Sequence, residues 1–214
     1  MSSNQTDNTR EKLFNAGVKV FAEKGYRDAT VREICKVAGS GNINSINYYF
    51  GSKENLYRTI LEAIFSAYDR FSQEEWDRKT PKAQLKSMIS SYCAMLYEDN
   101  AFASDVTAIF VTEMIRPSSF IKDLVDTYNG PRVKRHLKMF RALLGDGASD
   151  DNARDCLVSV AGQLFYYSFA WPVFSRLFPD YSPDQQYEQW AEHVYQFSLG
   201  GIAAIKKQLK QKAR

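Results

Sequence analysis

The chain has 214 residues, of which 44% are hydrophobic and 25% are charged, and it carries a net charge of +3. These values are ordinary for a soluble globular protein of one or two domains. No apolar run of about 18 residues occurs, so we expect no membrane span, and the first ten residues lack the apolar core of a secretion signal. The three cysteines form no CxxC pair, which predicts reduced thiols and a cytoplasmic location.

The charge is unevenly distributed along the chain. Residues 1–58 carry nine Lys/Arg and six Asp/Glu, whereas residues 59–205 carry fourteen against nineteen. The last nine residues add five positive charges and no negative one. A basic excess at the N-terminal part is suited to contact with nucleic-acid phosphates. The basic tail is better explained as a solvated helix end, where cations favour the dipole.

Two short helical segments joined by a turn are predicted within residues 30–53. Thr30 and Glu33 form a Thr-x-x-Glu capping box that marks a helix start, and Gly39 lies where that helix would stop. The second segment, 42–49, presents mostly small polar and aromatic side chains. A short helix of this kind suits a recognition helix in a DNA major groove.

These segments resemble the DNA-binding domain of TetR-family transcriptional regulators. The resemblance rests on Ile-Cys-Lys-Val-Ala-Gly, Ile-Asn-Tyr-Tyr-Phe and Gly-Ser-Lys-Glu-Asn-Leu-Tyr, and it runs from about Arg10 to Leu61. The turn at 39–42 is one residue longer than the commonest family version, and together with Tyr-Tyr-Phe-Gly-Ser-Lys it is similar to the CecR-like branch. Two registers therefore stay open for base contacts in residues 42–45.

The resemblance implies a set of DNA contacts, with Tyr48, Tyr49 and Lys53 on phosphates and three polar side chains closer to the bases. Asparagine can pair with adenine through two hydrogen bonds, which supports base reading by Asn residues here. An alternative is that one of the two tyrosines only packs inside the DNA-binding domain at 1–52, called the head below, and makes no DNA contact. Ile43, Ile46 and Phe50 are expected in the core. The complete DNA-binding set is Thr30, Arg32, Asn44, Ser45, Asn47, Tyr48, Tyr49 and Lys53.

The rest of the chain reads as helices, with no segment of strand periodicity. A first helix is expected at 10–25, and Ser52 caps a helix that links the two parts of the protein. Further helices are predicted at 81–98, 102–115, 118–144 (interrupted at 129–131), 153–170 with an end or kink at Trp171-Pro172, and from Pro183 onward. The fold class is all-α with about nine helices, divided into a helix-turn-helix domain at 1–52 and an effector-binding and dimerisation domain at 53–214.

No residue set for catalysis, metal or cofactor binding stands out. His136 and His193 have no partner at metal-ligand spacing, and no catalytic motif occurs, so we expect no enzyme and no cofactor. The family implies an effector pocket in the aromatic-rich body, for which plain core packing is the alternative. The candidate lining residues are Phe65, Tyr92, Phe110, Met114, Phe165 and Phe169.

The sequence thus predicts a ligand-responsive repressor that binds a palindromic operator in double-stranded DNA as a homodimer. Dimerisation is expected through the last two helices, which are strongly apolar. Alternatives are an activator or a regulator without a small ligand, and, further off, a helical ligand carrier or enzyme. The effector, the operator sequence and the regulated genes are not encoded in any visible motif.

Overall fold

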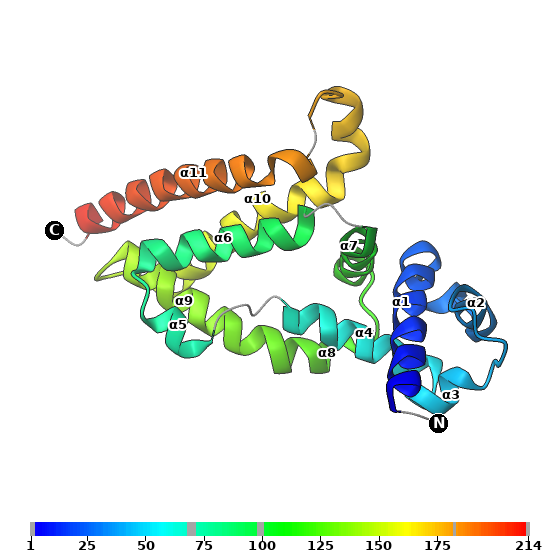
Figure 1. The fold of residues 1–214 in the computed structure, drawn as a ribbon. Helices are drawn as coiled ribbons and strands as arrows, with labels where there is room; N and C mark the ends of the chain where they lie inside the picture. Colours follow the sequence, from blue (N-terminus) through cyan, green and yellow to red (C-terminus); the bar gives the residue numbers. More distant parts are fainter. Residues whose placement is uncertain (1–2, 68–71, 98–100, 182, 213–214) are drawn as a thin grey trace. The chain divides into compact units, whose positions relative to one another are not determined.

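The structure, a computed structural model, describes residues 3–67, 72–97, 101–181 and 183–212, and within them it is all-α, as predicted (Figure 1). These residues form eleven α-helices and one short π-helix, η1, rather than about nine helices. Their contacts divide into two compact units. The predicted boundary at residue 52 stays a prediction, because the units group helices from separate parts of the sequence.

The first unit contains helices from both sides of the predicted boundary. Its helices are α1 (Ser3–Asp28), α2 (Val31–Val37), α3 (Ser45–Phe50), α4 (Lys53–Ala67), α7 (Ala101–Ile115) and α8 (Ile121–Leu124). Helix α1 packs against α2, α4 and α7. Its apolar face is buried, as are the inner faces of α2, α3 and α4, through Leu13, Phe21, Ile34, Ile46, Leu56, Ile60 and Leu61.

Glycines interrupt α1 and terminate α2 at the positions that the sequence predicts. Gly25 has φ 73° and interrupts the helical backbone of α1, and Gly39, with φ 68°, follows the last turn of α2. Only glycine adopts such left-handed angles without a steric cost. Helix α1 nevertheless begins at Ser3, earlier than predicted, because no Gly or Pro in the first ten residues stops it.

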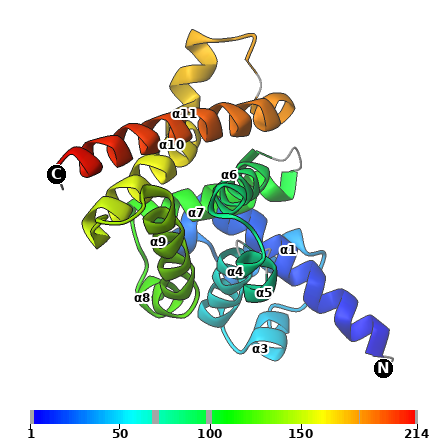
Figure 2. The same cartoon turned by 90° about the vertical axis from the view of Figure 1, so that its left-hand side faces the viewer.

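The second unit contains α5 (Gln73–Asp77), α6 (Pro81–Tyr97), α9 (Gly130–Leu144), α10 (Asp150–Leu177) and α11 (Pro183–Lys212). Helix α6 packs on α9 and α11, and α9 packs on α10 (Figures 1 and 2). The buried core includes Trp76, Leu85, Ile89, Phe140, Leu144, Leu164 and Val194. The α5 helix was missed, although Ser72 and Glu75 form a capping box at its start.

Two predicted breaks differ in the structure. The interruption at 129–131 is a π-helical segment, η1 (Val125–Asn129), and α9 follows it directly with proline in its first turn, so the change of helical hydrogen bonding falls next to the residue that lacks an N–H. Helix α10 runs on to Leu177, so Trp171-Pro172 does not end it. Aromatic contacts bracket the proline, with the Tyr166 and Phe174 rings 5.8 Å apart.

Among the described residues, no helix combines the length and apolarity needed to cross a membrane.

Candidate nucleic-acid interface

The turn between α2 and α3 is held by its own hydrogen bonds. The Ser40 hydroxyl lies 2.8 Å from the Ser45 hydroxyl and 3.3 Å from the Asn42 carbonyl oxygen. The backbone N–H of Asn44 donates to Oδ1 of Asn42 at 2.9 Å. These side-chain bonds add to the backbone bonds of the turn, from the Ser40 N–H to the Cys35 carbonyl oxygen and from the Ser45 N–H to the Asn42 carbonyl oxygen, so the start of α3 is fixed relative to α2.

Helix α3 presents one polar face to solvent. Asn44 and Asn47 are exposed, and Tyr48 is 77% exposed. These three residues are spaced three and four apart, so they share one side of the helix. Amide groups and a phenol on an exposed helix face can donate to and accept from base edges and phosphates.

Helix α3 begins at Ser45 rather than at Asn42, and this changes two predictions. Ser45 is only 9% exposed, and its hydroxyl pairs with Ser40, so its base contact stays a prediction. Ile43 lies in the turn and is 52% exposed, so the prediction that it belongs to the core is wrong. The periodic pattern placed it on the inner face only because the helix was assumed to include it. Ile46 and Phe50 are buried, as predicted.

The start of α2 carries the predicted capping box. The Thr30 hydroxyl accepts from the backbone N–H of Glu33 at 3.2 Å, and the Glu33 carboxylate accepts from the backbone N–H of Thr30 at 3.1 Å. Lys24 of α1 also pairs with Glu33. The Lys24 ammonium, followed by the Thr30 bonds, lowers the pKa of Glu33 to about 2. Arg32, two residues into α2, is exposed.

Lys53 is tied to the end of α1. Its ammonium donates to the carbonyl oxygens of Tyr26 and Ala29, both at 2.8 Å, and it lies 4.6 Å over the Tyr26 ring. An ammonium has three N–H donors, so one remains for a DNA phosphate. Tyr49 is half-buried and its ring makes an edge contact with Tyr48 at 4.8 Å.

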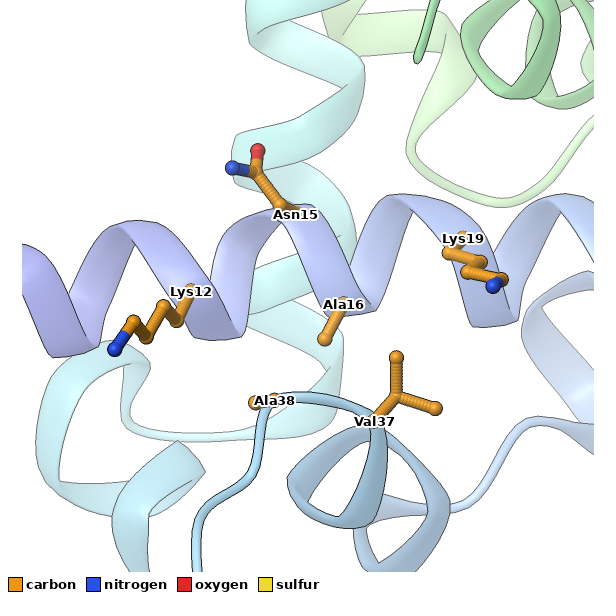
Figure 3. Close-up of a pocket in the computed structure, with 6 residues that line it drawn as sticks. All are labelled: Lys12, Asn15, Ala16, Lys19, Val37 and Ala38. Carbon is orange, nitrogen blue, oxygen red and sulfur yellow. The ribbon is translucent and has the colours of Figure 1, made fainter. Parts of the chain in front are cut away.

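Further basic residues of the head were not in the predicted set. The Arg10 guanidinium lies 5.1 Å from the Phe50 ring centroid, next to α3. Lys12 and Lys19 of α1 lie at the two sides of an open hollow of about 420 Å³, in which Ala16 faces Val37 (Figure 3). The basic excess of residues 1–58 was the available signal for these cations.

A buried polar contact joins α4 to α7. The Tyr57 hydroxyl donates to Oε1 of Glu113 at 2.7 Å, and Oε2 accepts from the Ser118 N–H and hydroxyl, both at 2.9 Å. Burial and the adjacent carboxylate raise the pKa of Tyr57 above its ordinary value. The Tyr57 ring also contacts Phe21 and Tyr26, at 4.8 Å each. The cluster connects the middle of α4 to the α1 end that holds Lys53.

The predicted ligand residues lie in two groups. In the first unit, the Phe65 and Phe110 rings are buried 6.0 Å apart, and Met114 is 42% exposed. In the second unit, the Tyr92 and Phe165 rings make an edge contact at 5.6 Å. Phe169 is 40% exposed. The lining role of all six stays a prediction.

Helices α10 and α11 leave large apolar side chains uncovered. Gly162, Tyr166, Phe174 and Trp190 are among the residues that line an open hollow of about 480 Å³ on these helices. A Cβ added at Gly162, Gly200 or Gly201 would meet nothing within 4 Å. The exposed apolar residues here are Val158, Tyr166, Phe169, Val173, Leu177, Phe178 and Phe197.

These features define a helix-turn-helix protein of the DNA-binding class, and two family models match it. Residues 13–60 match the bacterial regulatory proteins of the tetR family, and residues 81–202 match the C-terminal domain of the HTH-type transcriptional dual regulator CecR. The chain belongs to the TetR family of transcriptional regulators, with a CecR-type C-terminal domain. Members of this family bind DNA as regulators and are not enzymes, in agreement with the sequence prediction.

Known regulators resemble the chain over different lengths. The transcriptional repressor NicS of Pseudomonas putida is 33% identical over 87 residues, which is 40% of this chain and 41% of NicS. The fatty acid metabolism regulator protein of Bacillus subtilis is 28% identical over 158 residues, covering 72% of this chain and 76% of that protein. The match covers less than two thirds of NicS, and the same holds for the B. subtilis regulator YttP, at 57%.

A solved structure supports the fold. FadR of B. subtilis, crystallised with stearoyl-CoA, superposes with a TM-score of 0.64 at 17% identity. The alignment covers 86% of this chain and 97% of FadR. At this identity the likeness concerns the fold alone.

Proposed function

We propose that the chain is a ligand-responsive repressor that binds a palindromic operator as a homodimer in the cytoplasm. One observation carries the proposal: a turn fixed by hydrogen bonds presents Asn44, Asn47 and Tyr48 together on the exposed face of α3. Repression follows when the dimer occupies promoter DNA. Each head contacts one half-site, and the half-sites lie about one or more helical turns apart.

The contacts divide into base readers and phosphate binders. Asn44 and Asn47 read adenines through their amide groups, and Ser45 joins them through its hydroxyl. Arg32, Tyr48, Tyr49 and Lys53 bind phosphates and fix the register of the head on the duplex. Thr30, whose hydroxyl donates to the Glu33 carboxylate in the free protein, completes the proposed set of DNA contacts. Lys53 does so while it keeps the end of α1 in place, since two of its three donors are already engaged.

The dimer forms through α10 and α11. Val158, Val173, Leu177 and Phe197 are each more than 60% exposed in the single chain, and apolar surface of this kind marks an association site. The open glycines of both helices allow a second copy to approach closely. Two helices from each copy would form a four-helix bundle.

The effector is proposed to be a small molecule with an apolar part. The FadR crystal structure contains stearoyl-CoA, and a relative is named as a fatty acid metabolism regulator, so long-chain acyl-CoA is the first class to test. Phe65, Tyr92, Phe110, Met114, Phe165 and Phe169 remain the proposed contacts. The effector acts by binding one conformational state more tightly than the other, with α4 as the moving link to the head.

An activator role is the alternative, because the C-terminal family model is named for a dual regulator. Footprinting and in vitro transcription distinguish the two. The repressor account predicts two protected half-sites overlapping the promoter, less transcript when the protein is added, and recovery with acyl-CoA. More transcript on addition would favour the activator, and no footprint at any site would contradict both.

A further inference from the structure

The turn before α3 holds an aliphatic side chain in solvent. Ile43 is 52% exposed, whereas Ile34 and Ile46, the nearest core isoleucines in sequence, are fully buried. Its two sequence neighbours, Asn42 and Asn44, are exposed polar residues. An exposed branched side chain within a polar reading surface can gain free energy in a complex by covering its apolar area with another apolar group.

The position of Ile43 is fixed by the backbone around it. The Ile43 carbonyl oxygen accepts a weak bond from the buried Cys35 thiol at 3.8 Å. On either side, Ser40 and Ser45 bond to the Asn42 carbonyl oxygen, at 3.3 Å from the Ser40 hydroxyl and 3.1 Å from the Ser45 N–H. The side chain is therefore held outward by an ordered turn, immediately before the N-cap of the recognition helix.

The chemical groups on the base edges of the major groove determine which of them an aliphatic side chain can pack against. Residues at the start of a recognition helix reach base edges. Every base edge in the groove offers hydrogen-bond donors or acceptors, and only thymine adds an apolar group, its C5 methyl. Asn42 and Asn44 can use the polar groups, but Ile43 cannot.

We propose that Ile43 is a specificity-determining residue that packs on the C5 methyl group of a thymine in each operator half-site. The contact rests on the proposed operator binding and adds to it a base preference that hydrogen-bonding residues do not supply. Replacing that thymine by uracil removes one methyl group and leaves every hydrogen bond intact. We expect about three- to fivefold weaker binding per half-site, the value of one buried methyl.

The test begins with the whole 214-residue chain and a half-site selected from a random duplex pool. Each thymine of the selected duplex is then replaced by deoxyuridine, one at a time, and affinity is measured by fluorescence anisotropy. The wild type should select a thymine and lose affinity at one uracil position per half-site. Ile43→Ala should bind the thymine duplex more weakly and show a smaller loss with uracil at that position, because alanine keeps only one methyl group for the contact.

Val37→Ala is the matched control. Val37 is a similarly exposed aliphatic residue of the same head, at 49%, but it faces Ala16 of α1 in the hollow of Figure 3. This variant should keep the full uracil effect.

Three results would overturn the contact: no thymine in the selected half-site, no uracil effect in the wild type, or a full uracil effect in Ile43→Ala. If the wild type binds no duplex in a salt-dependent way, the proposed DNA function fails and the contact fails with it. If the wild type binds DNA specifically but shows no uracil effect, the contact of Ile43 with thymine is refuted and the proposed DNA function still stands.

Discussion

The phenol of Tyr57 donates a 2.7 Å hydrogen bond to the buried carboxylate of Glu113, which joins α4 to α7. The same tyrosine ring lies 4.8 Å from the Tyr26 ring, and the Tyr26 carbonyl oxygen holds Lys53. Movement of α7 relative to α4 would therefore shift the end of α1 and the position of Lys53, which lies close to the recognition helix α3. This chain of contacts lies entirely within the first unit.

Loss of the Tyr57 hydroxyl should destabilise the first unit. Tyr57→Phe keeps the ring packing but removes one donor from the carboxylate, leaving Glu113 with Ser118. Hydrogen bonds to charged groups contribute about 1.5–3 kcal/mol, and we expect a loss of that size in urea unfolding. Tyr48→Phe, at an exposed phenol, should unfold as the wild type does; equal losses in both variants would contradict the assignment.

A comparison of alanine variants at Lys53 and Arg32 should distinguish a structural role from a phosphate-binding role. Both Lys53→Ala and Arg32→Ala should weaken DNA binding and flatten the salt dependence by about one unit of slope. Only Lys53→Ala also breaks two hydrogen bonds to backbone carbonyls, so only this variant should melt at a lower temperature without DNA. An unchanged melting temperature for Lys53→Ala would show that the two bonds contribute no stability.

Stability should fall in acid because of His136. The side chain is buried beside Trp76 and Tyr92, and burial, followed by the charges of Arg132 and Arg135, lowers its pKa from 6.5 to about 3. Between these values the unfolded chain binds a proton that the folded chain does not. Stability therefore decreases as pH falls below 6.5, by up to about 1.4 kcal/mol per pH unit.

The measurement is the unfolding free energy between pH 7.5 and 5. His136→Gln should lose this slope, whereas His193→Gln, at an exposed ring stacked on Trp190, should keep it. A wild type whose stability does not change over this range would contradict the assignment to His136.

A charge on the α11 surface should prevent dimerisation. Phe197 is 66% exposed, and an aspartate buried in an interface would lack a partner. Phe197→Asp should sediment as a monomer, whereas we expect the wild type to sediment as a dimer, and it should bind a full operator more weakly because the two heads are no longer linked. Val133→Asp, on α9, is the control and should remain a dimer; a dimeric Phe197→Asp would place the interface elsewhere.

Local signals in the sequence predicted local structure well. The capping box of Thr30 and Glu33 and the stops at Gly25 and Gly39 depend on a few neighbouring residues, and the structure confirms each. The α5 capping box at Ser72 was equally visible but was not used.

Features that depend on distant contacts were not predictable in this way. The acceptors of Lys53 lie 24 and 27 residues earlier, and Tyr57 meets Glu113 across 56 residues. The prediction placed Ile43 in the core because it began the second helix at Asn42. In the structure α3 begins three residues later, at Ser45, so Ile43 lies in the turn. No pattern in one sequence records where such a tertiary contact falls.

The proposed function depends on base reading by α3, and the Asn47→Ala variant tests this property. The measurement is anisotropy binding to the chain's own promoter region at two salt concentrations, for the wild type and Asn47→Ala. We expect salt-dependent, sequence-specific binding by the wild type, and a loss of about 1–3 kcal/mol with relaxed base preference in the variant at an unchanged salt slope. Equal affinity and preference in the two proteins, or no salt-dependent binding by the wild type, would contradict it.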